Sequence, residues 1–146
     1  EHCIETALLE ADLICKKKGI RFTPIRKKIL EMIWASHGPV KAYDILDLLK
    51  ESFSSARPTT VYRSIDFLRN NGLIHKLTSL SAYIGCTHPL KHNDCYFLIC
   101  NACGIIRECC DSKLTKTIQA SSKKNKFILN QVTLEIDGTC EDCLNK

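Results

Sequence analysis

The chain has 146 residues, of which 45% are hydrophobic and 25% charged, so its composition fits one medium globular domain or two small ones. It contains no apolar run of membrane-spanning length and no secretory signal pattern, which predicts a cytoplasmic protein and favours metal over disulfides as the role of its ten cysteines. The net charge of +5 is uneven: residues 1–86 carry 13 basic and 9 acidic side chains, so this half is the candidate for binding a polyanion.

Hydrophobic periodicity divides the first half of the chain into four helices and a hairpin. We expect helices over 4–18, from Pro24 to the Gly38-Pro39 stop, over 42–53, and from Pro58 to Asn71-Gly72. Thr23 is the expected N-cap of the second helix, with Pro24 at its first position. Two alternating runs, 73–77 and 82–86, predict strands around a serine-containing turn. The order of elements predicts a winged helix-turn-helix DNA-binding domain over 1–86.

The second half of the chain has a different organisation. Residues 87–95 lack periodicity and are expected to form a hinge or linker. Strands are predicted over 96–100, 105–109 and 127–136, with a helix over 112–124. The whole chain is thus predicted to be α+β, with a small C-terminal α/β dimerisation domain over 96–146. A unit of about 50 residues is marginal alone and needs a metal, a partner chain or both.

Two cysteine pairs carry the most specific chemistry in the sequence. Cys100 and Cys103 form one C-x2-C pair, followed by Gly104, and Cys140 and Cys143 form the other. Each pair places two thiolates on one tight turn, which is half of a zinc tetrahedron. Two disulfides or a redox-active pair are the competing interpretations. A redox site needs only one pair, so the spacing favours a closed, structural four-cysteine zinc site.

A basic segment and the start of the fourth helix are the candidate DNA-binding elements. Residues 16–28 hold seven basic side chains and no acidic one. With Val61, Ile65 and Leu68 facing the core, the N-terminal residues of the fourth helix can point outward, as in a recognition helix. The competing interpretation is a solvated charged surface, which is strongest for Lys16–Lys18. The predicted DNA contacts are Lys17, Arg21, Tyr43, Thr59, Thr60, Tyr62 and Arg63.

Several of these motifs together resemble the ferric uptake regulator (Fur) family over nearly the whole chain. The matching segments are Arg21–Arg26, Pro58–Leu68, Cys100–Gly104 and Cys140–Cys143. The resemblance implies a bacterial homodimer that binds a palindromic operator when metal occupies a regulatory site at the hinge. Segments 41–49 and 72–76 are most similar to the zinc-sensing branch. Ile25 replaces a glutamine usual in the family, the histidine-rich run of the iron branch is missing, and no family role is assigned to Cys3, Cys15, Cys95, Cys109 and Cys110.

The resemblance also implies a second, regulatory zinc site formed by His75, Cys86, His92 and Glu108. Strand alternation supports part of it, because His75 shares a face with Leu73 and Leu77, and Cys86 shares one with Ala82 and Ile84. His88 lies four residues before His92 and is an alternative ligand from the linker. Each residue also has an ordinary interpretation: a core histidine, a small buried cysteine and a solvated glutamate.

The resemblance implies that the chain is no enzyme but a zinc-responsive repressor that binds operator DNA as a metal-loaded homodimer and represses zinc-acquisition genes. An iron or peroxide sensor of the same family is an alternative, disfavoured by the thiolate of Cys86. A zinc-dependent hydrolase or deaminase is another, but no His-x-Glu or His-Glu-x-x-His signature is present. A zinc-binding adaptor that does not bind DNA is disfavoured by the basic recognition helix.

Overall fold

In a computed structural model that describes residues 2–146, the chain forms two compact units. The first unit ends at Pro89 and the second covers Leu90–Lys146, so the division lies within the segment predicted as a linker. None of the helices formed by residues 2–146 has both the length and the apolar character needed to cross a bilayer.

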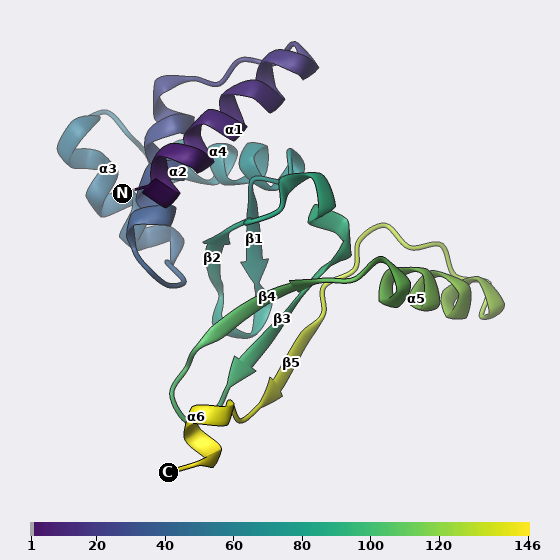
Figure 1. Ribbon diagram of the computed structural model, residues 1–146. Coiled ribbons are helices and arrows are strands. Elements are labelled where there is room, and N and C mark those ends of the chain that lie inside the picture. The colour runs from purple at the N-terminus through teal and green to yellow at the C-terminus, as the bar shows by residue number, and fades with distance from the viewer. Residues whose placement is uncertain (1) are drawn as a thin grey trace. The chain divides into compact units, whose positions relative to one another are not determined.

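The first unit is a winged helix, as predicted. It consists of α1 (His2–Lys18), α2 (Pro24–Ala35), α3 (Ala42–Ser52), α4 (Pro58–Asn70), β1 (Ile74–Leu77) and β2 (Ala82–Gly85), as Figure 1 shows. The Thr23 hydroxyl accepts a hydrogen bond from the Arg26 N–H at 3.4 Å, which confirms its predicted role as the N-cap of α2. Gly72 follows α4 with a φ of +71°, a conformation that glycine adopts without strain.

The core of the first unit lies among α2, α3, α4 and the hairpin. The apolar stripes predicted from helical spacing are buried or half-buried, and the fully buried side chains include Ile29, Ile33, Ile45, Leu49, Val61, Ile65, Leu68 and Ile74. Burying a side chain of this size contributes about 1.5–3 kcal/mol each. Because three of these residues lie on one face of α4, the opposite face of that helix is held towards solvent.

The hairpin of the first unit is short, and one of its strands is hydrogen-bonded to the segment just before α3. Strands β1 and β2 are antiparallel, with Ile74 opposite Gly85 and Leu77 opposite Ala82. Val40, just before α3, exchanges two backbone hydrogen bonds with Tyr83 at 2.9 and 2.8 Å. The ladder continues past β2, because the Cys86 N–H donates to the Leu73 carbonyl at 3.0 Å. The backbone around Cys86 is therefore fixed by regular pairing.

Gly85 lets the hairpin approach α2 closely, and replacing it should destabilise the first unit. A Cβ at this position would overlap the indole ring of Trp34, which packs against the core. We expect Gly85→Ala to lower the free energy of unfolding by about 1–3 kcal/mol, the usual cost of overpacking. Gly38→Ala is the matched control, since a Cβ there meets open space. Urea unfolding of both variants tests this, and equal stability would contradict it.

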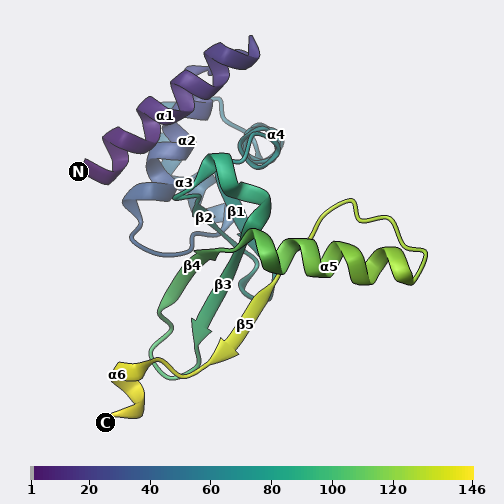
Figure 2. The ribbon, with the colours of Figure 1, turned by 45° about the vertical axis from the view of Figure 1, so that its right-hand side comes forward.

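The second unit contains a three-stranded sheet of order β4-β3-β5. Strands β3 (Cys95–Cys100) and β4 (Ile106–Cys110) are antiparallel, whereas β5 (Glu135–Gly138) is parallel to β3 (Figure 2). A parallel pair requires a crossover connection. Helix α5 (Ser112–Lys124) forms part of that crossover and is capped by Asp111, whose carboxylate accepts from the Lys113 N–H at 2.9 Å. A short helix, α6 (Glu141–Leu144), ends the chain's regular structure.

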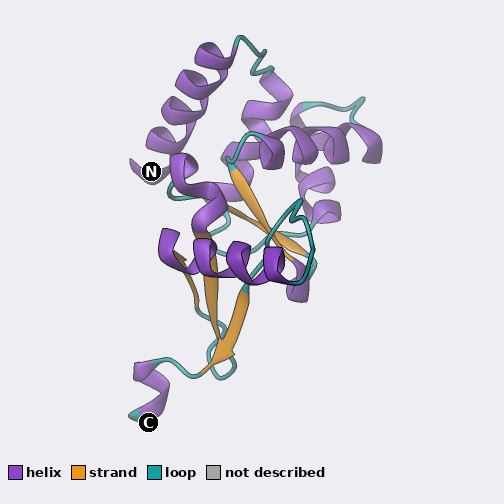
Figure 3. Cartoon of the chain, turned by 90° about the vertical axis from the view of Figure 1, so that its right-hand side faces the viewer, coloured by secondary structure: helices purple, strands orange, loops and turns teal. Residues whose placement is uncertain are grey.

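One expectation for this unit was wrong in detail. The strand predicted over 127–136 forms only at Glu135–Gly138, and a loop replaces it over 127–134 (Figure 3). Pairing with β3 begins only at Leu134, whose carbonyl accepts from the Phe97 N–H at 3.0 Å, so the β-forming residues before it have no partner among the described strands. Phe127 and Ile128 are accordingly 68% and 88% exposed. The segment predicted as a linker forms 3-10 turns over Pro89–Asp94, and β3 starts at Cys95.

Candidate metal centres and nucleic-acid interface

The parallel ladder of the second unit brings the two cysteine pairs together. Cys100 is the last residue of β3 and lies opposite Gly138, the last residue of β5. The Asn101 N–H donates to the Gly138 carbonyl at 2.8 Å, so the pairing continues one residue further. Cys140 follows two residues after Gly138 and begins α6 as its N-cap. Pairs that are far apart in the sequence therefore meet at the same end of the sheet.

The four cysteines form a compact cluster suited to zinc. The Sγ atoms of Cys100, Cys103, Cys140 and Cys143 all lie within 4.8 Å of one another. None of them forms a disulfide, and the Sγ atoms of Cys103 and Cys140 are 3.7 Å apart. A tetrahedral zinc with Zn–S bonds of about 2.3 Å places its sulfur ligands about 3.8 Å apart. The cluster fits one zinc ion held by four thiolates, which leaves no position for a substrate.

Hydrogen bonds at this cluster shift the pKa values of two of its cysteines. Gly104, at a φ of +75°, turns the chain so that its N–H donates to the Cys100 carbonyl at 2.9 Å. N–H donors of Cys140 and Cys103 lower the pKa of Cys100 to about 6, the Cys140 N–H lying 3.3 Å from its sulfur. Hydrogen bonds to Cys140 and Cys103 raise the pKa of Cys143 to about 12. Zinc binding therefore displaces protons from this cluster.

A second set of donor side chains lies in the hairpin of the first unit. His75 is opposite Ile84 in the ladder, and Cys86 is opposite Leu73, so the two side chains are diagonal neighbours on one face. Both are buried, with exposed fractions of 8% for His75 and 2% for Cys86. Their ligand atoms lie within 4.8 Å of each other. We call these two residues the hairpin pair, which supplies one imidazole and one thiolate to a metal.

The second unit holds the other predicted ligands of the regulatory site. Glu108 is half-buried in β4, opposite the buried Phe97. His92 is half-buried in the 3-10 turns before β3, and His88 is exposed. Cys95, which the sequence left without a role, has its sulfur within 4.8 Å of a Glu108 ligand atom. Sequence spacing alone did not single out Cys95, because its place beside Glu108 depends on the register across the β3–β4 turn.

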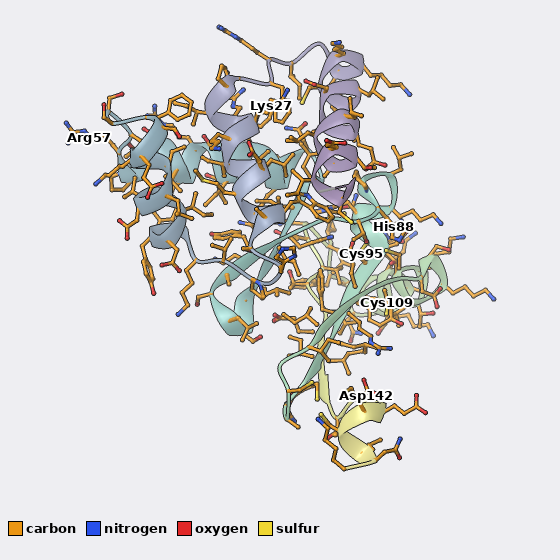
Figure 4. All side chains as sticks on the ribbon, turned by 60° about the vertical axis from the view of Figure 1, so that its left-hand side comes forward. Lys27, Arg57, His88, Cys95, Cys109 and Asp142 are labelled. Carbon is orange, nitrogen blue, oxygen red and sulfur yellow. The ribbon has the colours of Figure 1, made fainter. Side chains whose placement is uncertain are left out.

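The N-terminal part of α4 presents a polar, aromatic surface. Tyr62 and Arg63 are exposed, as predicted from the buried stripe on the other face of the helix, and Thr59 is exposed as well. Thr60 is half-buried, and its hydroxyl accepts from the Arg57 N–H at 3.2 Å. Part of the hydrogen-bonding capacity of Thr60 is therefore used to begin the helix. Arg57, labelled in Figure 4, is exposed beside these residues at the same helix start.

The remaining predicted DNA contacts are exposed as well, and an unpredicted residue joins their elements. Lys17, Arg21 and Tyr43 are all exposed. The Arg26 guanidinium lies over the Phe67 ring of α4, 3.8 Å from its centroid, and also donates to the Arg21 carbonyl at 2.6 Å. The loop carrying Arg21 is thereby connected to α4 through a cation–π contact. Sequence reasoning gave Arg26 a positive charge but not this packing role.

Comparisons with known proteins agree with the fold. The model of the ferric uptake regulator family matches residues 17–137, and the chain belongs to that family. It is 35% identical to the zinc uptake regulation protein of Escherichia coli over 94% of this chain and 81% of that protein. It is 32% identical to the peroxide operon regulator of Bacillus subtilis over 95% and 94% of the two chains. A solved structure described as a zinc uptake regulator complexed with zinc and DNA superposes with a TM-score of 0.87 at 32% identity, covering 97% and 95%.

Proposed function

We propose that this protein is a zinc-responsive transcriptional repressor that binds operator DNA as a metal-loaded homodimer and represses zinc-acquisition genes. The observation that carries this proposal is the hairpin pair, a buried thiolate donor beside a buried imidazole in the winged-helix unit. A cysteine ligand suits Zn²⁺, whereas iron sites of this kind prefer nitrogen and oxygen ligands. The similarity to a zinc-sensing relative points the same way.

The regulatory ion is proposed to bind His75 and Cys86 from the first unit together with Glu108 and a linker histidine, His92, from the second. Such a set supplies four protein ligands and completes a zinc tetrahedron. Joining residues of both units by one ion would restrict the angle between them, so that metal controls the DNA-binding geometry. In this proposal 1–86 is the DNA-binding domain, 87–95 the hinge and 96–146 the dimerisation domain.

Helix α4 is the proposed recognition helix. Its N-terminal residues would contact base edges in the major groove, with Arg63 pairing to guanine and Tyr62 contacting a thymine methyl or a phosphate. Thr59 and Thr60 lie in the same turn of the helix. Lys17, Arg21 and Tyr43 are proposed to contact the phosphate backbone, which fixes position without reading sequence.

The sheet of the second unit offers a surface for a second copy of the chain. Leu98 and Ile136 are register partners on the face opposite Phe97, and both are partly exposed, as is nearby Ile105. Pairing such faces around a two-fold axis would make a homodimer that presents two recognition helices to a palindromic operator. We propose that this dimer acts in the bacterial cytoplasm, where thiols stay reduced.

Two other functions have weaker support from the donor side chains. The identities to the zinc and peroxide regulators, 35% and 32%, are close, so donor chemistry decides between them, and the buried Cys86 favours zinc. A zinc hydrolase needs an open coordination position and a separate general base. The four-cysteine cluster and the proposed regulatory set each supply all four ligands from the protein. We therefore propose a regulator rather than an enzyme.

Operator binding titrated against free metal tests this function. The dimer with its four-cysteine site filled is titrated with Zn²⁺, Fe²⁺ or Mn²⁺ in the presence of operator duplex. We expect Zn²⁺ to promote binding at far lower free concentration than the other two ions. Binding that responds to Fe²⁺ or Mn²⁺ first would replace zinc sensing by iron or peroxide sensing. Binding that no metal changes would leave only a DNA-binding protein.

Substituting the proposed base-reading and phosphate-binding residues separates their roles. Arg63→Ala should weaken operator binding by about 1–3 kcal/mol more than it weakens binding to random duplex. Lys17→Ala should weaken both kinds of binding alike and lower the salt dependence by about one counterion. Affinities measured on both duplexes over a range of salt concentrations distinguish the two. If both variants lose equal affinity on all DNA, Arg63 does not read bases.

A further inference from the structure

Two half-buried ligand atoms of the second unit lie on the face of the sheet that also carries Phe97. In the β3–β4 ladder, Cys95 is opposite Cys110 and Phe97 is opposite Glu108. Side chains alternate along a strand, so Cys95 and Glu108 are diagonal neighbours on this one face. Their ligand atoms lie within 4.8 Å of each other. One thiolate and one carboxylate on a single zinc ion are separated by about 3.5 Å, so a small adjustment allows both to bind one ion.

The backbone of Cys95 is held by the sheet, whereas that of His92 is not. The Asp111 N–H donates to the Asp94 carbonyl at 3.0 Å, which closes the ladder directly before Cys95. His92 lies in 3-10 turns that are interrupted at Lys91, where φ is −115° and ψ is 18°. A ligand on a paired strand is better preorganised than one in such a turn.

The chemistry of Cys95 also suits a metal ligand. Its thiol donates a hydrogen bond to the Lys91 carbonyl at 3.2 Å, so its sulfur lies beside the segment that leads into β3. Figure 4 labels Cys95 and Cys109, which belong to the neighbouring strands β3 and β4. Tyr96 is opposite Cys109, so that side chain lies on the other face, away from Glu108. Of these two cysteines, only Cys95 shares a face with the carboxylate.

From this placement we infer that Cys95, rather than His92, completes the regulatory site with His75, Cys86 and Glu108. The inference rests on the regulatory site proposed above and changes its ligand set. Two thiolates, one imidazole and one carboxylate would give the zinc site a net charge of −1 instead of zero. A second soft ligand strengthens the preference for zinc over iron and manganese. It also makes the site depend on both cysteines being reduced.

Cobalt substitution measures the number of thiolates directly. Dimer whose four-cysteine site is filled with zinc is titrated with Co²⁺, and the thiolate-to-cobalt charge-transfer absorption of the second site is recorded. Cys95→Ser should lose about half of this intensity, because one of two thiolate ligands is removed, and should bind cobalt more weakly. His92→Ala should keep the wild-type intensity and affinity. Cys110→Ser is the matched control, since Cys110 is half-buried on the same face and should leave both unchanged.

The other outcomes separate this inference from the proposed function. If Cys95→Ser keeps the wild-type spectrum while His92→Ala weakens cobalt binding, His92 is the ligand, the inference is overturned and zinc sensing stands. If the wild-type dimer binds no cobalt beyond its four-cysteine site, both the inference and the regulatory site fail. In every variant, retained structural zinc and retained dimerisation show that the protein has folded.

Discussion

Replacing Cys143 by serine should unfold the second unit and abolish dimerisation. Within Leu90–Lys146, all of which the structure describes, only Phe97 and Cys100 are buried hydrophobic residues. Such a unit has too small a core to fold on apolar burial alone. Structural zinc contributes on the order of 10–16 kcal/mol in zinc-finger peptides near neutral pH, which far exceeds what this core supplies. Serine is a poor zinc ligand, so most of that stabilisation should be lost.

Zinc content per chain and sedimentation velocity measure the outcome. Cys143→Ser should lose the structural zinc and sediment as a monomer with a disordered second unit, while the helical signal of the first unit remains. Cys109→Ser is the matched control, because Cys109 is also half-buried in the second unit but belongs to neither group of candidate ligands. A stable Cys143→Ser dimer with unchanged zinc content would remove the structural role of this cluster.

Local signals in the sequence predicted the first unit well. The start of α2 follows from Thr23 and Pro24, because an N-cap hydroxyl and a proline at the first helical position act within a few residues. The outward position of Tyr62 and Arg63 follows from the burial of Val61 and Ile65 on the same helix. These features depend on residues that are close in the sequence. The sequence pattern was therefore sufficient to predict them.

Features of the second unit that depend on pairing between distant strands could not be predicted in the same way. Residues 127–134 have strong β-forming side chains, yet a strand exists only where β3 offers a partner. The four-cysteine cluster was predicted because its spacing is itself a motif. Cys95 has no such motif. Its position beside Glu108 depends on the register across the β3–β4 turn, and a shift of one residue would reverse its face.

Replacing Cys86 by serine should separate metal sensing from folding. Cys86 is fixed by the hydrogen bond from its N–H to Leu73 and belongs to the hairpin of the first unit. Removing its thiolate takes a strong ligand from the proposed regulatory site but leaves the four-cysteine cluster intact. The variant should keep its structural zinc and its dimer, lose the second zinc, and bind operator about 5- to 150-fold more weakly under saturating zinc, the usual range of allosteric coupling.

The Cys86→Ser variant needs a control, because burying a serine hydroxyl at a site that is only 2% exposed lowers the stability of the fold by itself. Cys15→Ser provides it, since Cys15 is 1% exposed in the same unit and belongs to neither group of candidate ligands. Both variants should lose similar thermal stability, but only Cys86→Ser should lose the second zinc and the zinc dependence of operator binding. If Cys86→Ser keeps wild-type zinc content and operator affinity, Cys86 is a packing residue. The preference for zinc over iron would then lack its chemical basis, because the thiolate is the donor that distinguishes the two metals.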